Sequence, residues 1–251
     1  MSRELFEEQR TDLIEIVNNM MHNYDFATAI IKNEKTELNG YRDSFNIWCS
    51  THYLDFNKIG IAQICSGCTK ICVIPIDLDY VIKVDIDLSQ IETYNSAVRA
   101  YNYCAREYAN YVCAVDNHIE KFFAETYELC TVDGFHFFAQ EKCACNEGDV
   151  EEALYESVSN SFDDSCINED TTNYSEEDLE DLRNSYIWDQ IGDLYDEERF
   201  HCLFNGDDRI DDLEHFIEMR SIDDLHNGNF GRTERGFVII DFSGYSRVWD
   251  N

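Results

Sequence analysis

Apolar residues recur at helical spacing along the first part of the chain. Between residues 2 and 35 they form one broad stripe, made of Leu13, Ile14, Ile16, Val17, Met20 and Met21. Residues three and four apart share one face of a helix, so this pattern predicts a helix with one buried face. The apolar run 25–31 continues it or forms a second helix, Asn39-Gly40 marks a turn, and the aromatic-rich stretch 44–57 predicts a further helix.

From residue 59 the pattern changes to short β-prone runs separated by turn residues. Five such runs occur, over 59–64, 71–74, 80–84, 120–129 and 135–140. Val132-Asp133-Gly134 lies between the last two, and Asp-Gly is a strong signal for a tight hairpin turn. We therefore expect a five-stranded antiparallel sheet, in which Ser66-Gly67-Cys68-Thr69 joins the first two strands.

Helical spacing returns after the third strand and again near the C-terminus. The apolar residues of 88–113 predict one long helix or two, and those of 186–202 and 207–220 predict two more. Ser175-Glu176-Glu177-Asp178 has the pattern of a helix N-cap, in which a short polar side chain is followed by acids. The polar segment 159–174 is expected to be a mobile loop.

Two polar motifs follow the last of these helices. Asp224-Leu225-His226-Asn227-Gly228-Asn229 reads as a loop, and Val238-Ile239-Ile240-Asp241 reads as a buried strand that ends in an acid. Asp224 could orient an attacking hydroxyl, and the oxygens of Asn229 and Asp241 are ligands of the kind that Mg²⁺ takes. This layout suits phosphoryl transfer from a metal-bound nucleotide. The alternative is that Asn227-Gly228 simply reverses the chain.

Lys83 stands among apolar residues in the third strand, Val81-Ile82-Lys83-Val84. Successive side chains of a strand point to opposite faces, so Lys83 points away from its neighbours and can act as a point charge on nucleotide phosphates. The alternative is an edge-strand lysine that guards against aggregation.

The order and spacing of these residues resemble those of protein kinases. In that family a lysine strand precedes a catalytic loop, which reads D-L-x-x-x-N here, and a metal-binding D-F-G. In this chain the last motif is Asp241-Phe242-Ser243, the phosphate loop has the single glycine Gly67, and Ile222 and Asp223 replace the usual His and Arg. The V-I-K-V and D-L-H-N-G-N segments most resemble the early Ser/Thr protein kinase domain of tailed bacteriophages.

The resemblance implies a two-lobed, protein-kinase-like α+β fold with a minimal helical C-lobe. Residues 1–57 would be an N-terminal helical extension, and 58–142 an N-lobe that contains the five-stranded antiparallel sheet. Residues 143–251 would be the C-lobe, with an acidic insert and the catalytic loop. Glu141-Lys142-Cys143 would be the hinge along which adenine lies. Because about ten residues follow Asp241, no activation segment is expected.

The resemblance also implies an activity and a role for each site residue. Asp224 and Lys83 would be catalytic, and Asn229 and Asp241 would hold Mg²⁺. The residues that bind ATP would be Gly67, Cys68, Thr69, Lys83 and Glu107. Kinases pair the strand lysine with a glutamate, for which Glu92 and Glu107 are the two candidates here, and we prefer Glu107. The implied activity is phosphorylation of host proteins on Ser or Thr, in host takeover or evasion of host defence.

The net charge of −33 narrows the choice of partners. The chain has 52 acidic and 19 basic residues, with a dense acidic run over 146–185. Such a charge repels nucleic acid and anionic membranes, so we expect a basic protein as substrate or partner. Three other interpretations stay open: a merely solvated acidic surface, a small-molecule kinase, and a kinase-fold binding protein that inhibits a basic partner or mimics the charge of a nucleic acid.

Eleven cysteines, an odd number, are scattered through apolar segments. No signal peptide is recognisable, and no apolar run approaches the roughly 20 residues of a membrane span. We therefore expect a cytoplasmic protein with free thiols, in the host cytoplasm if it is viral. The alternative is a zinc site built from Cys65, Cys68, Cys143 and Cys145, because zinc takes four such ligands.

Overall fold

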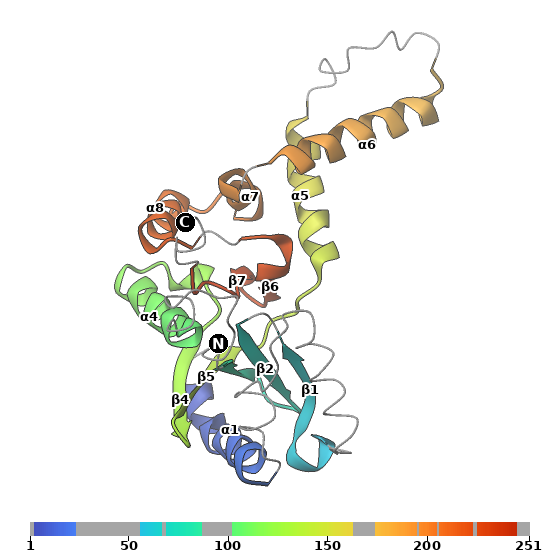
Figure 1. The fold of residues 1–251 in the computed structure, drawn as a ribbon. Coiled ribbons are helices and arrows are strands. Elements are labelled where there is room, and N and C mark those ends of the chain that lie inside the picture. Colours follow the sequence, from blue (N-terminus) through green and yellow to red (C-terminus); the bar gives the residue numbers. More distant parts are fainter. Residues whose placement is uncertain are drawn as a thin grey trace, which may run out of the picture.

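The protein is an α+β structure built on a five-stranded antiparallel sheet (Figure 1). The computed structural model describes residues 3–23, 56–66, 69–86, 102–162, 174–194, 196–204, 206–222 and 225–244. The expectations for 25–31, Asn39-Gly40 and most of 44–57 lie outside these residues. No helix in the described ranges is long and apolar enough to cross a membrane.

The sheet has the strand order β1-β2-β3-β5-β4, and every neighbouring pair is antiparallel. The strands are β1 (Ile61–Ser66), β2 (Lys70–Pro75), β3 (Tyr80–Asp85), β4 (Thr126–Val132) and β5 (Phe135–Glu141). The predicted five-stranded antiparallel sheet is therefore confirmed. Asp133 and Gly134 both have positive φ, 51° and 86°, which is the backbone that a tight Asp-Gly hairpin requires.

The fourth strand starts later than the sequence predicts. Residues 120–122 form the 3-10 helix η3 (Glu120–Phe122), and β4 begins only at Thr126. Phe122 and Phe123 are buried in a cluster outside the sheet, so their apolar character indicates burial and not strand pairing. The β prediction for 120–125 is wrong for this reason.

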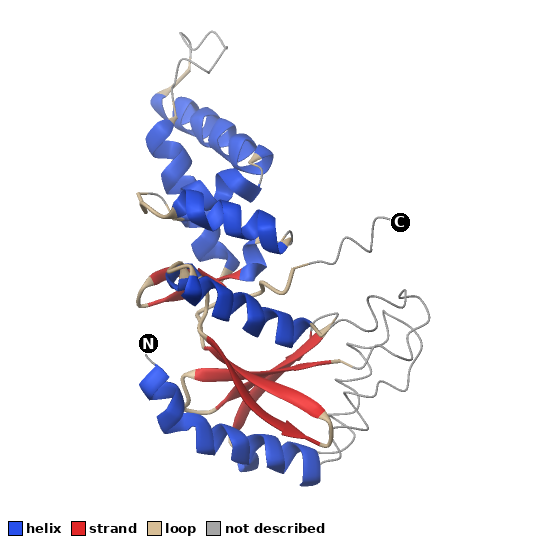
Figure 2. Cartoon of the chain, turned by 90° about the vertical axis from the view of Figure 1, so that its left-hand side faces the viewer, coloured by secondary structure: helices blue, strands red, loops and turns tan. Residues whose placement is uncertain are grey.

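Helix α1 (Arg3–Asn23) covers one face of the sheet, and Figure 2 shows α4 on the opposite face. The predicted apolar stripe of α1 packs on the alternating apolar residues of the central strands. This first core contains Leu13, Val17, Met20, Ile71, Val73, Tyr80, Ile82, Val84 and Phe137. The helix prediction is confirmed over 3–23, and the sheet face that carries Lys83 lies away from α1.

Truncating a methionine in α1 should cost far more stability than truncating one on the surface. Met20 is 1% exposed in the first core, whereas Met219 is 69% exposed. Met20→Ala should lower the free energy of unfolding by about 2–5 kcal/mol, because it removes buried methylenes and leaves a cavity. Met219→Ala should change it by less than about 0.5 kcal/mol. Urea denaturation of both variants checks this, and equal losses would contradict the packing of α1.

Helix α4 (Tyr103–Asp116) begins at a well-defined cap, where the Asn102 side chain accepts a hydrogen bond from the backbone N–H of Ala105. It agrees with the second part of the helix predicted over 88–113, and residues 87–101 lie outside the described ranges. Its buried face carries Glu107 and Asn110, both 0% exposed. Burial of two polar side chains on one helix face requires partners from other elements.

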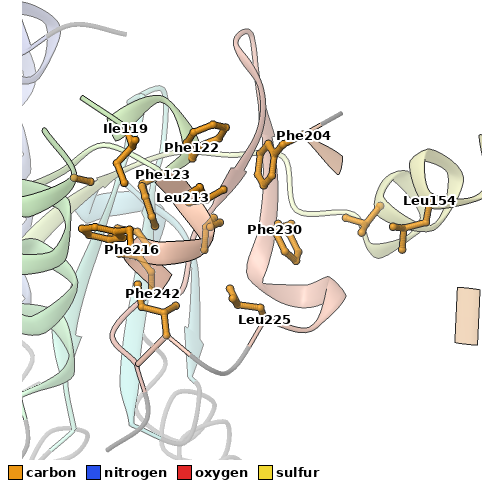
Figure 3. Close-up of a cluster of buried hydrophobic side chains, with 14 of the residues drawn as sticks. Ile119, Phe122, Phe123, Leu154, Phe204, Leu213, Phe216, Leu225, Phe230 and Phe242 are labelled. Carbon is orange, nitrogen blue, oxygen red and sulfur yellow. The ribbon is translucent and has the colours of Figure 1, made fainter. Parts of the chain in front are cut away.

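The helices α5 (Glu147–Ser161), α6 (Glu176–Asp193), α7 (Asp196–Leu203) and α8 (Ile210–Arg220) precede the hairpin of β6 (Phe230–Thr233) and β7 (Gly236–Ile239). The 3-10 helix η6 (Asn227–Asn229) leads into β6. Figure 1 shows α5 and α6 extending away from the sheet. Figure 3 shows a second apolar core around the hairpin, with Phe123, Phe216, Phe230 and Phe242 among its residues.

Two predictions in the helical half need correction, and one segment for which no element is predicted proves to be a helix. Residues 147–161 form α5, because Val150, Leu154 and Val158 are buried at four-residue spacing beneath an acidic surface. The loop prediction is therefore wrong over 159–161, and residues 163–173 lie outside the described ranges. The single helix predicted over 186–202 is broken after Asp193, since Leu194 adopts an extended backbone. The N-cap at Ser175 is confirmed as a reciprocal capping box with Asp178.

Candidate functional site

Two lysines lie on the sheet face turned away from α1. In the β2–β3 register Lys70 is opposite Asp85, and Cys72 is opposite Lys83. The intervening residues of both strands belong to the first core, so strand alternation places these four side chains on the other face. Lys70 and Lys83 are therefore diagonal neighbours on one face of the sheet.

Glu107 of α4 joins the two lysines. Its Oε1 lies 2.5 Å from the Nζ of Lys70, and its Oε2 lies 3.0 Å from the Nζ of Lys83. The carboxylate is fully buried, and the two lysines are 9% and 8% exposed. Of the two carboxylates considered from the sequence, Glu107 pairs with Lys83, and Glu92 lies outside the described residues.

The segment after β7 closes the cluster from the other side. The Nζ of Lys83 donates to the carbonyl of Ile240 at 2.8 Å, and the Nζ of Lys70 lies 2.5 Å from Oδ1 of Asp241. The Ile240 N–H donates to the Asn229 carbonyl at 2.9 Å. The fold thus brings Lys83, Glu107 and Asp241 together from distant parts of the chain, and the backbone of Asn229 lies beside Ile240. Asp241 follows the strand by two residues and does not end it, because β7 stops at Ile239.

The position of Asp241 is held by its neighbour Phe242. The Phe242 carbonyl accepts a 2.6 Å hydrogen bond from Nδ2 of Asn110, whose Oδ1 accepts one of 2.7 Å from Nε of Arg220. The Phe242 ring is buried against Phe123, with centroids 5.0 Å apart (Figure 3). Asn110 of α4 and Arg220 of α8 therefore hold the backbone next to Asp241 in place.

The chain can pass this point only because residue 244 is glycine. Gly244 has a φ of 74°, and a Cβ added there would lie 2.5 Å from the carbonyl oxygen of Ser221. The glycine therefore follows Asp241-Phe242 one position later than in the kinase motif. Ser243 stands between them, with its Oγ 3.4 Å from Oδ1 of Asp241.

Electrostatics keep both lysines and Asp241 charged. Burial alone would lower the pKa of Lys70, but the carboxylates of Glu107 and Asp241 outweigh it and hold that pKa above its ordinary value. Lys83 behaves in the same way, with its pKa raised chiefly by Glu107 against the effect of burial. Burial would raise the pKa of Asp241, but Lys70 and Lys83 together hold it well below its usual range. Two ammonium groups thus face the ionised Asp241 and the buried Glu107, whose pKa is raised by burial against the opposing effect of both lysines.

The expected Mg²⁺ site does not fit this arrangement as it stands. Asn229 and Asp241 offer oxygen donors of the right kind, and the Asp241 side chain is 37% exposed. However, Oδ1 of Asp241 is already in contact with the Lys70 ammonium, whose charge would repel a divalent cation. Among the described residues there is no group of three His, Cys, Asp or Glu side chains that could hold a metal.

Several predicted site residues lie outside the described ranges, namely Asp224, Gly67 and Cys68. Thr69 is described, and its carbonyl accepts a 2.9 Å hydrogen bond from the Ile86 N–H at the end of the β2–β3 ladder. In the predicted hinge, the N–H groups of Glu141 and Lys142 donate to the carbonyls of Glu125 and Asp79. These two N–H groups are therefore already hydrogen-bonded to carbonyls of the protein's own backbone.

The cysteines that the structure describes are eight free thiols. Burial raises the pKa of Cys72 to about 11, against the opposing effect of Lys83. Such a thiol is weakly reactive, because the thiolate is the nucleophilic form. The zinc interpretation also needs Cys68, which lies outside the described ranges.

The sequence reasoning missed Lys70. The second strand was predicted over 71–74, which starts one residue too late, since β2 runs from Lys70. The available signal was strand alternation: Lys70 and Cys72 lie on one face of the strand, and the apolar Ile71 and Val73 lie on the other. Only the pairing register with β3 reveals that this face of the strand also carries Lys83 and contacts Glu107.

Asp85, at the end of β3, offers a test of the site's pH dependence. Its Oδ1 accepts a 3.0 Å hydrogen bond from the N–H of Cys104 at the start of α4, and burial raises its pKa to about 6. The folded protein thus binds the proton of the Asp85 carboxyl group more tightly than the unfolded chain does. As the pH rises from about 4 to about 6, stability should fall, and the loss is complete above that window.

Asp85→Asn should remove this loss, because the amide oxygen can still accept from Cys104 but cannot ionise. Above pH 7 the variant should be more stable than the wild type by about 1–3 kcal/mol, and the gain should vanish near pH 4. Denaturant titrations at several pH values measure it. Asp133→Asn, at an exposed turn residue, is the matched control. A gain that does not change with pH would contradict the burial of Asp85.

Taken together, the cluster gathers groups of the kind that contact phosphate. Two charged ammonium groups lie beside one buried carboxylate and one partly exposed carboxylate, and Lys–phosphate contacts are strong because both partners are ionised. Scans against protein-family models and searches of curated proteins and of solved structures found no match for this chain.

Proposed function

We propose that the protein is an ATP-dependent Ser/Thr protein kinase that phosphorylates host proteins, with a two-lobed kinase-like fold. The observation that carries the proposal is the pairing of Lys83 with Glu107, joined through the Ile240 carbonyl to the segment of Asp241. The strand order, with α4 between β3 and β4, supports it because a kinase N-lobe places its lysine and glutamate on the same elements. A role as a phage factor in host takeover or evasion of defence belongs to the same proposal.

In this proposal the substrate hydroxyl attacks the γ-phosphorus of ATP. A bond forms between the hydroxyl oxygen and the phosphorus, the bond to the β–γ bridging oxygen breaks, and a nucleoside diphosphate leaves. Asp224 accepts the hydroxyl proton, and Lys83 holds the phosphates while Glu107 orients its ammonium. Mg²⁺, where bound, would neutralise phosphate charge. The Lys70 ammonium already contacts Asp241, the acid that would hold the ion.

The test is transfer of label from γ-labelled ATP, with and without Mg²⁺ and with and without a host-cell lysate. We expect label on serine or threonine of lysate proteins with the wild type and with Lys58→Met, which removes an exposed lysine. We expect none with Lys83→Met. Label in small molecules alone would indicate a small-molecule kinase, and no transfer by the wild type in any arm would contradict the proposal.

A second candidate is a catalytically weak kinase-fold protein that binds a basic partner. The contact of Lys70 with Asp241 favours it, because it occupies the carboxylate that catalysis in kinases uses for metal. The exposed acids at the start of α6, Glu176, Glu177 and Asp178, favour a basic partner under either candidate. In the kinase proposal they would select substrates with Lys or Arg around the target residue, with a steep salt dependence.

A further inference from the structure

Lys70 puts a second cation into a site where one lysine would suffice for the proposed activity. Its ammonium lies 2.5 Å from both Glu107 and Asp241 and 3.5 Å from Oγ of Ser243. An ammonium has three donors, so these contacts account for its hydrogen-bonding capacity. Within this cluster, Glu107 forms ion pairs with both lysines, whereas Asp241 forms an ion pair with Lys70 only.

The two acids that hold Lys70 differ in access. Glu107 is fully buried and bridges both lysines, so its contact with Lys70 is enclosed by the fold. The Asp241 side chain is 37% exposed, so this contact faces the approach of a ligand. A phosphate group can replace Asp241 as the anion at Lys70, and Lys70 and Glu107 then each keep a partner of opposite charge. Replacing this one contact would give a ligand access to the Lys70 ammonium.

We propose that Lys70 is a second phosphate-binding residue, which takes the place of a divalent metal, so that nucleotide binds in the absence of Mg²⁺. This inference rests on the proposed function, since it concerns the same nucleotide. The ligand class is a nucleoside di- or triphosphate. Two ammonium groups that share one carboxylate lie close together, so adjacent phosphoryl groups of one nucleotide would offer more contacts to them than a single phosphate.

The inference is tested by nucleotide binding, with no turnover required. Calorimetric titration with ADP, in EDTA and in Mg²⁺, should give the wild type similar affinities in the two buffers. Lys70→Met should weaken binding in EDTA by about 10- to 100-fold, because a charge-assisted contact to phosphate is lost. AMP should bind far more weakly than ADP to the wild type. Lys58→Met, the same change at an exposed lysine, should match the wild type.

Asp241→Asn should affect the affinity for ADP differently, depending on whether Lys70 binds the phosphates or Asp241 binds a metal. If Lys70 serves the phosphates, the variant should bind ADP in EDTA as tightly as the wild type or more tightly, since the competing anion is gone. If Asp241 holds a metal, the variant should instead lose affinity in Mg²⁺. This arm remains informative even if Lys70→Met unfolds. The double variant Lys70→Met/Asp241→Asn removes one charge of each sign and checks folding by its thermal melt.

The outcomes separate the inference from the proposed function. Binding of ADP that requires Mg²⁺ in the wild type, with Lys70→Met unaffected, would overturn the role of Lys70 and leave the kinase proposal intact. No binding of ADP or ATP by folded protein in either buffer would overturn both. Binding in EDTA that is lost in Lys70→Met and kept in Asp241→Asn supports the inference.

Discussion

Replacing Asp224 by asparagine should lower the rate of phosphate transfer by about 10²- to 10⁴-fold, the range typical of losing a general base. The amide keeps the size and shape of the side chain but cannot accept the hydroxyl proton. The described residues on either side, Ile222 and Leu225, are buried in the second core. Initial rates with labelled ATP measure the effect, and the affinity for ADP should stay unchanged.

The matched control for this variant is Asp208→Asn, which also removes one negative charge. The Asp208 side chain is 93% exposed, so its loss should leave the transfer rate unchanged. Partner binding should survive in both variants, because each removes one of 52 acidic residues. If Asp224→Asn keeps the full biological effect of the wild type, the kinase proposal fails and the acidic binding protein takes its place.

Glu107→Gln should be the most destabilising isosteric change in the cluster. It leaves the buried ammonium of Lys83 without a carboxylate partner and leaves Lys70 with Asp241 alone. Removing one member of a buried ionic network costs about 3–5 kcal/mol, because the remaining charges stay desolvated without full compensation. Urea denaturation should show this loss in the free energy of unfolding, together with loss of ADP binding.

Glu151→Gln is the control for Glu107→Gln, since Glu151 is exposed on α5. Its effect on stability should be within about 0.5 kcal/mol of zero. Should Glu107→Gln prove as stable as this control, Glu107 would not be the shared counter-ion of the two lysines. The double variant Glu107→Gln/Lys70→Met should recover part of the loss, because it restores the balance of charge.

The elements that the sequence predicts well are those that local physics decides. The Asp133-Gly134 hairpin follows from the ease with which these residues adopt positive φ, and the Ser175 cap follows from a side chain that binds its own helix. The five strands and α1 follow from apolar periodicity. The choice of Glu107 over Glu92 rested instead on the resemblance to kinases, and the 3.0 Å contact to Lys83 agrees with it.

Only the tertiary structure decides what depends on register and on burial between distant segments. Lys70 joins the site because β2 pairs with β3 so that it faces Glu107 and Asp241, which lie 37 and 171 positions away in the chain. No local pattern encodes that convergence. Likewise, 147–161 becomes a helix because its sparse apolar residues find the second core, while its many acids dominate the sequence signal. Periodicity thus determined the elements, and packing decided which charges meet.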